Sequence, residues 1–324
     1  MSLSSRFSLK TLAVAVALSV GASFSAAAAD APAPTARAVA PARGHVPILW
    51  KISDRDNTLY LLGSFHLLRS TDLPLSPDIA AAMADAKSTM FELDMVSMMS
   101  PENLAKVQAY QKLEGDKPLS ALLPAPTREK LEALLKVGGT PMSAVDGLDA
   151  WALSLNLNLG TMMAMGFNGE NGPDRLLSLQ ADKEGKPRLA LETLDDEFSV
   201  FERTPLDEQV LGITRFVDDP KQVVTQTMKM HDQWMAGDLD GLGRDALARM
   251  RSETPATYRL LVVDRNDAWL PQLKARLDAH HAGDNTLAVV GALHLAGEDG
   301  LLAKLRAEGY RVERICSACG NGPR

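Results

Sequence analysis

Residues 59–67 read LYLLGSFHL and residues 287–295 read LAVVGALHL. Leucine, glycine, histidine and leucine coincide in the two stretches, and most positions between them are apolar in both. Each stretch predicts a β-strand that ends at a glycine, with His66 or His294 three residues after that glycine. In open α/β sheets the carboxyl ends of the strands form the edge where ligands bind. The repeated pattern therefore predicts that both histidines meet at one edge of a sheet.

The sequence around the two stretches predicts a mixed α/β fold. Residues 48–52 and 58–63 are β-prone runs separated by Ser-Asp-Arg-Asp-Asn, which favours a β-hairpin. Ser76-Pro77-Asp78 is typical of a helix start, and a strand at 89–93 follows, so this β-α-β order indicates a parallel pair. Further strands are expected at 188–191, 286–290 and 311–315, and further helices at 174–183, 264–281 and 298–308.

We expect one catalytic-type α/β domain over residues 46–316. A helical insertion at about 100–170 and a second helical stretch at about 195–250 interrupt its strands. Residues 317–324 form a short tail rich in glycine, asparagine and proline.

The N-terminus predicts export. Residues 1–29 contain two early basic residues, an apolar run at 11–24 and a small-residue end, as in a cleaved signal peptide. The apolar run is shorter than the roughly 20 residues that a membrane helix needs. Residues 30–45 are rich in alanine and proline and predict a flexible tether. We therefore expect an exported, periplasmic protein with no transmembrane segment in its mature chain.

The net charge and the two cysteines limit the classes of function that fit the sequence. The net charge of −7 and the pI near 5.4 argue against a nucleic-acid partner, which requires a basic surface. The two cysteines, Cys316 and Cys319, lie near the end of the chain with no helix after them. This context favours a disulfide or a plain tail over redox catalysis. A zinc ribbon would need a second cysteine pair.

Two glutamates recur at strand ends. Glu92 ends the strand at 89–93, and Glu192 follows the strand at 188–191. A carboxylate in an apolar strand needs an opposite charge or a metal. Together with His66 and His294, these glutamates predict a site for a divalent ion such as Zn²⁺, Mn²⁺ or Co²⁺. The alternative for each histidine is a core residue that donates to a backbone carbonyl.

Arg265 and Asn266 open the expected helix at 264–281, with Asp264 as its N-cap. They form either a solvated turn or a guanidinium clamp for a carboxylate, a phosphate or an oxyanion. The methionines at 162–165 are expected to fill the core, although an exposed methionine face would suit a peptide. The remaining histidines lack the strand–glycine context and are interpreted as surface or helix residues: His45, His231, His280 and His281.

Several blocks together resemble the TraB/GumN (TraB/PrgY/GumN) family over about residues 47–315. They are LWKISDRDNTLYLLGSFHLL with FELD, LALETLDDEF, LVVDRNDAWLPQL and LAVVGALHLAGEDGLLAKLRAEGYRVERI. The resemblance implies an α/β fold like those of the Tiki proteins, the erythromycin esterases and the haem-associated ChaN proteins. Tiki proteins are similar to metal-dependent proteases with two Gly-x-x-His motifs. Ser64 and Phe65 stand where many members carry threonine and an aliphatic residue.

The resemblance implies site residues that match position by position. Its two motifs fall on His66 and His294, its acidic positions on Glu92 and Glu192, and its Arg-Asn pair on Arg265 and Asn266. We therefore expect metal ligands at His66, His294, Glu92 and Glu192, and catalytic roles for both glutamates, Arg265 and Asn266.

The first hypothesis is a metal-dependent hydrolase, peptidase-like, that acts on a peptide or small molecule. The metal would activate water, one glutamate would act as general base, and Arg265 would stabilise the oxyanion. The alternative is a non-catalytic periplasmic protein that sequesters a peptide, a polysaccharide fragment or haem. A serine hydrolase is disfavoured because no Gly-x-Ser-x-Gly motif occurs.

Overall fold

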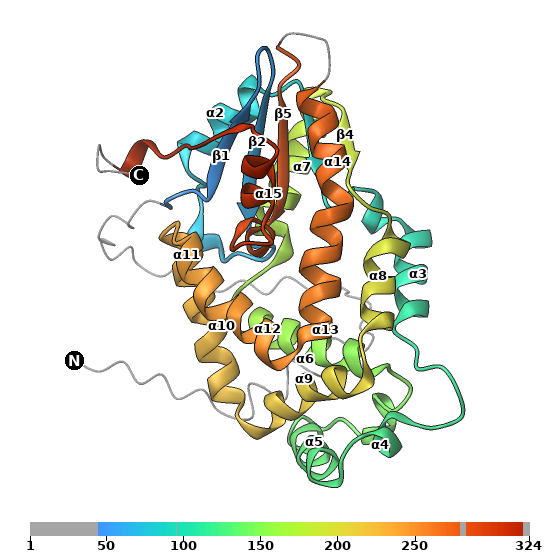
Figure 1. The fold of residues 1–324 in the computed structure, drawn as a ribbon. Coiled ribbons are helices and arrows are strands. Elements are labelled where there is room, and N and C mark those ends of the chain that lie inside the picture. The colour runs from blue at the N-terminus through green and yellow to red at the C-terminus, as the bar shows by residue number, and fades with distance from the viewer. Residues whose placement is uncertain (1–44, 95, 279–282, 320–324) are drawn as a thin grey trace, which may run out of the picture.

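The computed structural model describes residues 45–94, 96–278 and 283–319. A six-stranded mixed sheet in the order β4-β3-β5-β2-β1-β6 forms its centre (Figure 1). The strands are β1 (Leu49–Ser53), β2 (Thr58–Ser64), β3 (Ser88–Phe91), β4 (Arg188–Ala190), β5 (Thr286–Gly291) and β6 (Arg311–Arg314). The predicted mixed α/β class is confirmed.

The sheet order brings the two repeated stretches together. β1 and β2 form the predicted antiparallel hairpin, and β5 is parallel to both β2 and β3. The prediction that β2 and β3 pair directly was wrong, because β5 lies between them. Every residue of β5 is buried, as expected for a central parallel strand that is covered on both faces. Ser64 of β2 is paired with Gly291 of β5, so the two Gly-x-x-His units leave the sheet side by side.

Helices cover both faces of the sheet. Alternate strand residues pack on α2 (Pro77–Asp85) and α7 (Pro173–Glu184) on one face. The opposite face packs on α14 (Arg265–Leu277) and α15 (Leu301–Ala307), with Trp234 of α10 (Pro220–Met235) in the same core. The carboxyl end of the sheet is thereby enclosed between two helical layers.

A helical lobe lies beyond the carboxyl ends of the strands, below the sheet in Figure 1. Its helices are α3 (Pro101–Tyr110), α4 (Leu119–Leu122), α5 (Ala125–Val137), α6 (Ala150–Ala164), α8 (Leu194–Arg203), α9 (Leu206–Asp218), α10 (Pro220–Met235), α11 (Leu239–Leu242), α12 (Ala248–Glu253) and α13 (Pro255–Tyr258). Two π-helical turns, Gly243–Leu247 and Arg259–Asp264, join some of them. None of the helices in the described part of the chain is long and apolar enough to cross a membrane.

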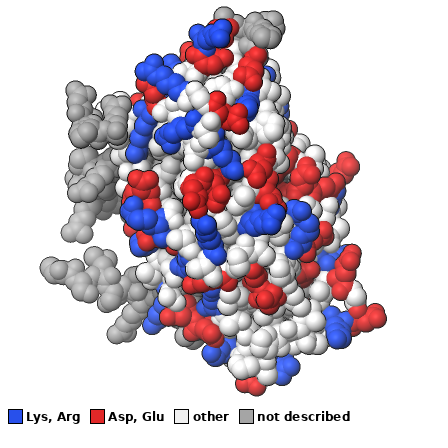
Figure 2. All heavy atoms as spheres, viewed as in Figure 1, with Lys and Arg blue, Asp and Glu red and all other residues white. Residues whose placement is uncertain are grey.

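Single-turn 3₁₀ helices occur in the connections. They are η1 (Ser70–Asp72), η2 (Ser97–Met99), η3 (Met142–Ala144), η4 (Gly169–Asn171), η7 (Ala292–Leu295) and η8 (Ser317–Cys319). On the face that Figure 2 presents, acidic and basic side chains are interspersed.

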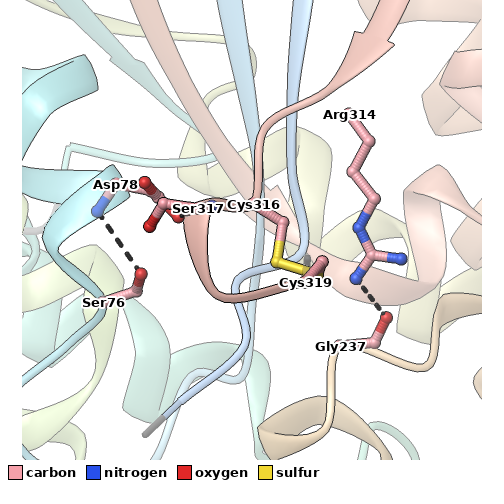
Figure 3. Close-up of a disulfide and its surroundings, with 7 residues drawn as sticks. All are labelled: Ser76, Asp78, Gly237, Arg314, Cys316, Ser317 and Cys319. Atoms are coloured by element: carbon pink, nitrogen blue, oxygen red, sulfur yellow. Dashed lines mark hydrogen bonds between the residues drawn. A yellow bond between two sulfur atoms is a disulfide. The ribbon is translucent and has the colours of Figure 1, made fainter. Parts of the chain in front are cut away.

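Both ends of the described chain are attached to the domain. Cys316 and Cys319 form a disulfide, and the backbone N–H of Ser317 donates to Asp78 of α2 at 2.8 Å (Figure 3). At the other end His45 is buried and stacks on Trp234 with ring centroids 4.1 Å apart. Its interpretation as a surface or helix residue was wrong, because it packs under α10 just before β1. The predicted signal peptide at 1–29, the predicted tether up to residue 44, and His280 and His281 lie outside the described residues.

Candidate active site

The carboxyl edge of the sheet gathers the sequence-predicted residues around Gly291. A Cβ at Gly291 would lie 3.0 Å from Nε2 of His66 and 3.4 Å from Oε1 of Glu92. The glycine therefore serves two purposes at this edge: it ends β5 and lets two functional side chains approach the backbone. Its N–H donates to Oε1 of Glu92 at 2.6 Å, which fixes the carboxylate at the edge.

Arg265 is the centre of a charged cluster. Its Nη2 donates to Glu92 at 2.8 Å and to Glu192 at 2.5 Å, and its Nε donates to Glu192 at 3.1 Å. Trp269 supports this arrangement, because its ring lies 4.6 Å from the guanidinium carbon and its Nε1 donates to Glu192 at 3.2 Å. Arg265 thus clamps two carboxylates of the protein itself, and the clamp expected for a ligand or an oxyanion stays a prediction.

The side chains of Glu92 and Glu192 are 12% and 6% exposed, and that of Arg265 is 10% exposed, so the cluster is largely shielded from solvent. Burial alone would raise the pKa of Glu92, but Arg265, the two histidines and the Gly291 N–H lower it to about 2. Burial also raises the pKa of Glu192, and the bonds from Arg265 oppose that rise only in part. Glu92 is therefore ionised at neutral pH, and a proton is held more readily on Glu192.

Asn266 sets the protonation of His294. Its Nδ2 donates to the carbonyl oxygens of His294 at 3.2 Å and Asp299 at 2.9 Å, so its Oδ1 is an acceptor. That oxygen lies 2.8 Å from Nδ1 of His294, which must carry the proton. Nε2 is then the acceptor for Nη1 of Arg265, 3.3 Å away. Burial lowers the pKa of His294 to about 3 against the opposing effect of Glu92, so this imidazole is neutral.

Asp264 does not cap α14. It makes no capping hydrogen bond, because the π-helical turn Arg259–Asp264 continues directly into the helix. The predicted N-cap was therefore wrong. The continuous helical path places Arg265 against the two glutamates and the next residue, Asn266, against His294.

His66 has a different environment from His294. Its Nδ1 lies 3.1 Å from Oδ2 of Asp174, and the hydroxyl of Ser64 donates to the same oxygen. The side chain of His66 is 52% exposed, whereas that of Asp174 is 8% exposed. Burial acts to lower the pKa of His66, but Asp174, Glu92 and Glu197 together raise it to about 10. His66 thus presents a protonated Nε2 to the site at neutral pH.

Two acidic residues of the site were missed from the sequence. Asp174 lies in the first turn of α7, after Gly172-Pro173, and looks like an ordinary helix-start residue. Glu197 lies in the first turn of α8, where Asp195 and Asp196 disguise it in the same way. Its carboxyl is half-buried, and the charges of Glu92, Glu192, Arg265 and His66 act on it. Burial and Glu92 raise its pKa to about 7.

The four predicted metal ligands meet at this edge, but Arg265 bonds three of them, Glu92, Glu192 and His294. Among the described residues, no group of three or more His, Cys, Asp or Glu side chains is arranged to hold a metal ion. Nε2 of His294 and Oε1 of Glu92 are 3.9 Å apart, with the guanidinium bonded to both side chains. As placed, these donors do not fit a divalent ion.

An open cavity of about 460 Å³ reaches the cluster between α8 and α14. Glu192, Arg265 and Trp269 form its inner wall, with Val200 and Leu260 among its apolar lining. The cavity connects the buried ion pairs to the surface and is large enough for an amino-acid side chain.

The sequence model of the TraB/PrgY/gumN family matches residues 48–314, which include every site residue described above. The chain belongs to the TraB/PrgY/gumN family. Within this family it is similar to proteins named "Uncharacterized protein YbaP" from Escherichia coli (strain K12) and Shigella flexneri. Each is 22% identical over 249 residues, which cover 76% of this chain and 87% of the relative. No solved structure matches the chain significantly. The relation to Tiki proteins stays a prediction.

Proposed function

We propose that this TraB-family protein hydrolyses acyl bonds of the peptide type. The observation that carries the proposal is the setting of His66. Asp174 holds its Nδ1, while its Nε2 lies beside Gly291 and Glu92, and the charge of Glu197 also acts on the ring. A fixed proton donor that interacts electrostatically with a carboxyl group of pKa near 7 is a suitable pair for acid–base hydrolysis.

The chemistry divides between these groups. The carboxylate of Glu197 takes a proton from water as the water oxygen attacks the acyl carbon. Negative charge then develops on the carbonyl oxygen, where the Nε2–H of His66 stabilises it by a hydrogen bond. When the C–N bond breaks, Glu197 returns the proton to the leaving nitrogen, and a carboxylic acid and an amine are released.

Arg265 has few N–H groups left for a substrate, because most of them already donate to protein acceptors. Of its five N–H groups, Nε uses one, Nη2 uses two and Nη1 uses one on protein acceptors. One Nη1 proton remains for the developing oxyanion. Glu92, Glu192 and Asn266 then act by positioning Arg265 and His294, and touch no reacting atom in this scheme.

The charge of the site favours a neutral scissile bond. Four carboxyl groups, on Glu92, Asp174, Glu192 and Glu197, interact with the cations of Arg265 and His66. A phosphate ester would add negative charge to this set and would be repelled. An amide or peptide bond brings no charge, and a side chain of the substrate fits the cavity beside Glu192.

A library of mixed-sequence peptides, analysed for cleavage by mass spectrometry, tests the proposal. We expect cleavage by the wild type and losses of about 10²–10⁴-fold in the Glu197→Gln and His66→Gln variants. Glu202→Gln is the matched control, because Glu202 is exposed on the same helix α8. Peptides that bind without being cleaved would overturn hydrolysis and favour a sequestering protein.

We also propose that the protein is exported to the periplasm. The support is the signal-like sequence of residues 1–29 together with the Cys316–Cys319 disulfide, a bond typical of oxidising compartments. The mass of the protein recovered from its host should correspond to a chain that begins near residue 30. A full-length mass in the cytoplasmic fraction would contradict export.

A further inference from the structure

The site contains the donor types of a divalent-metal centre, yet a guanidinium engages them. Oε2 of Glu92, both carboxylate oxygens of Glu192 and Nε2 of His294 all accept from Arg265. The remaining oxygen of Glu92 accepts from the N–H of Gly291. Each carboxylate oxygen of both glutamates, and the free ring nitrogen of His294, is therefore already bonded.

We infer that Arg265 is the permanent cation of this site and takes the place of the divalent ion that the same residues would otherwise bind. Two buried carboxylates require a positive charge, and Arg265 supplies it from a side chain that is 10% exposed. A planar guanidinium with several donors can bridge two carboxylates, as it does here. A metal ion would have to displace it or lie beside a like charge.

Arg265 is held in this position from its outer side as well. The ring of Trp269 lies against the guanidinium at 4.6 Å, and its Nε1 donates to the same Glu192 that Arg265 binds. The π-helical turn before α14 brings the backbone of Arg265 to the cluster. These contacts favour a single arrangement, in which Glu92, Glu192 and His294 stay bonded to Arg265.

The inference makes a gain-of-function prediction. In the Arg265→Ala variant, Glu92, Glu192 and His294 lose their common partner but keep their positions just after β3, just after β4 and on η7. Two carboxylates and an imidazole within one pocket form a typical site for Zn²⁺. The variant should therefore bind a metal ion that the wild type does not.

Metal binding is measured with Zn²⁺, Mn²⁺ and Co²⁺ alone, by elemental mass spectrometry after equilibrium dialysis of the untagged protein. We expect far less than one ion per chain in the wild type. In Arg265→Ala we expect one Zn²⁺ per chain. The gain in Zn²⁺ affinity over the wild type should be on the order of 100-fold, the size of effect that residues around metal ligands have on metal affinity. His294→Ala added to this variant should remove the gain. Arg259→Ala is the matched control, because Arg259 is 78% exposed in the preceding turn.

One ion per wild-type chain, lost in the His66→Ala/His294→Ala double variant, would overturn the inference. So would a folded Arg265→Ala variant that gains no metal affinity. If the Arg265→Ala variant does not fold, the metal content of the wild type still tests the inference. The inference concerns the same site as the proposed hydrolase but is tested without turnover. A wild type that cleaves peptides and holds metal contradicts only this inference, whereas one that does neither contradicts only the hydrolase.

Discussion

The two Gly-x-x-His units share their spacing and leave adjacent strands, but the structure gives their histidines opposite properties. His66 is half-exposed and bonded through Nδ1 to a carboxylate, Asp174, which raises its pKa to about 10. His294 is buried and bonded through Nδ1 to an amide, Asn266, and burial lowers its pKa to about 3. The motif thus fixes where a histidine lies, while its neighbour from another element decides what the histidine can do.

Arg265 bonds Glu92, Glu192 and His294, and its removal should have the largest effect on stability. Arg265→Ala leaves Glu92 and Glu192 buried without a cation, so we expect a loss of about 3–5 kcal/mol in the free energy of unfolding. Urea denaturation measures this loss. Arg259→Ala, in the preceding turn, should change stability by about 0.5 kcal/mol or less. Equal losses in the two variants would show that the cluster is not held by Arg265.

Removing His294 should affect folding more than removing His66. His294→Ala leaves the Oδ1 of the fully buried Asn266 without its donor, which costs about 1–3 kcal/mol, beyond any packing loss. His66→Ala removes a half-exposed ring, and the loss should be smaller. Denaturation midpoints of the two variants, at pH 7, test the comparison. A larger loss for His66→Ala would reverse the assignment of the structural and the reactive histidine.

The Asp174→Asn substitution should bring the pKa of His66 closer to that of His294. The amide cannot stabilise a positive charge as a carboxylate does, so the pKa of His66 should fall from its raised value. NMR titration of the imidazole carbon-bound protons measures the shift. The variant should also shift any alkaline loss of peptide cleavage to lower pH, a readout that a general loss of folding would not produce. An unchanged titration of His66 would exclude Asp174 as the cause.

The position of the site was predictable from the sequence, but its bonding was not. The strand–glycine–histidine repeat and the strand-end glutamates placed His66, His294, Glu92 and Glu192 at one sheet edge, where they lie. Their relation to Arg265 depends on how α14 packs against the sheet. Glu192 and Glu92 precede Arg265 by 73 and 173 residues in the sequence. Local patterns carry no information about such long-range contacts, and a metal was therefore the natural expectation.

Other differences from the sequence-based expectations have the same cause. The direct pairing of β2 with β3 was a reasonable inference from neighbouring elements, yet the distant β5 is more apolar and fully buried, and occupies the central position. Asp174 and Glu197 were overlooked because acidic residues are common in first helical turns, where they interact with the helix dipole. Asp174 and Glu197 belong to the site only because α7 and α8 approach the edge of the sheet.

The contributions of His294 and His66 to the unfolding free energy should change with pH in opposite directions. His294 has a folded pKa of about 3, below its ordinary value near 6.5, so its contribution is present above pH 6.5 and is lost as the pH falls toward 3. His66 has a raised folded pKa, so its contribution is present below pH 6.5 and is lost as the pH rises toward 10.

The difference between wild type and each variant isolates these contributions from those of His45 and Glu197, which titrate in the same acid range. Between pH 5 and 6.5, His294→Ala should remove a slope of up to about 1.4 kcal/mol per pH unit from the unfolding free energy. His66→Gln should instead flatten the curve above pH 7, by a smaller amount because this ring is half-exposed. Urea denaturation across the pH range gives both curves. If both variants flatten the same side, the two histidines share one environment, and the division between a neutral structural imidazole and a charged reactive one is wrong.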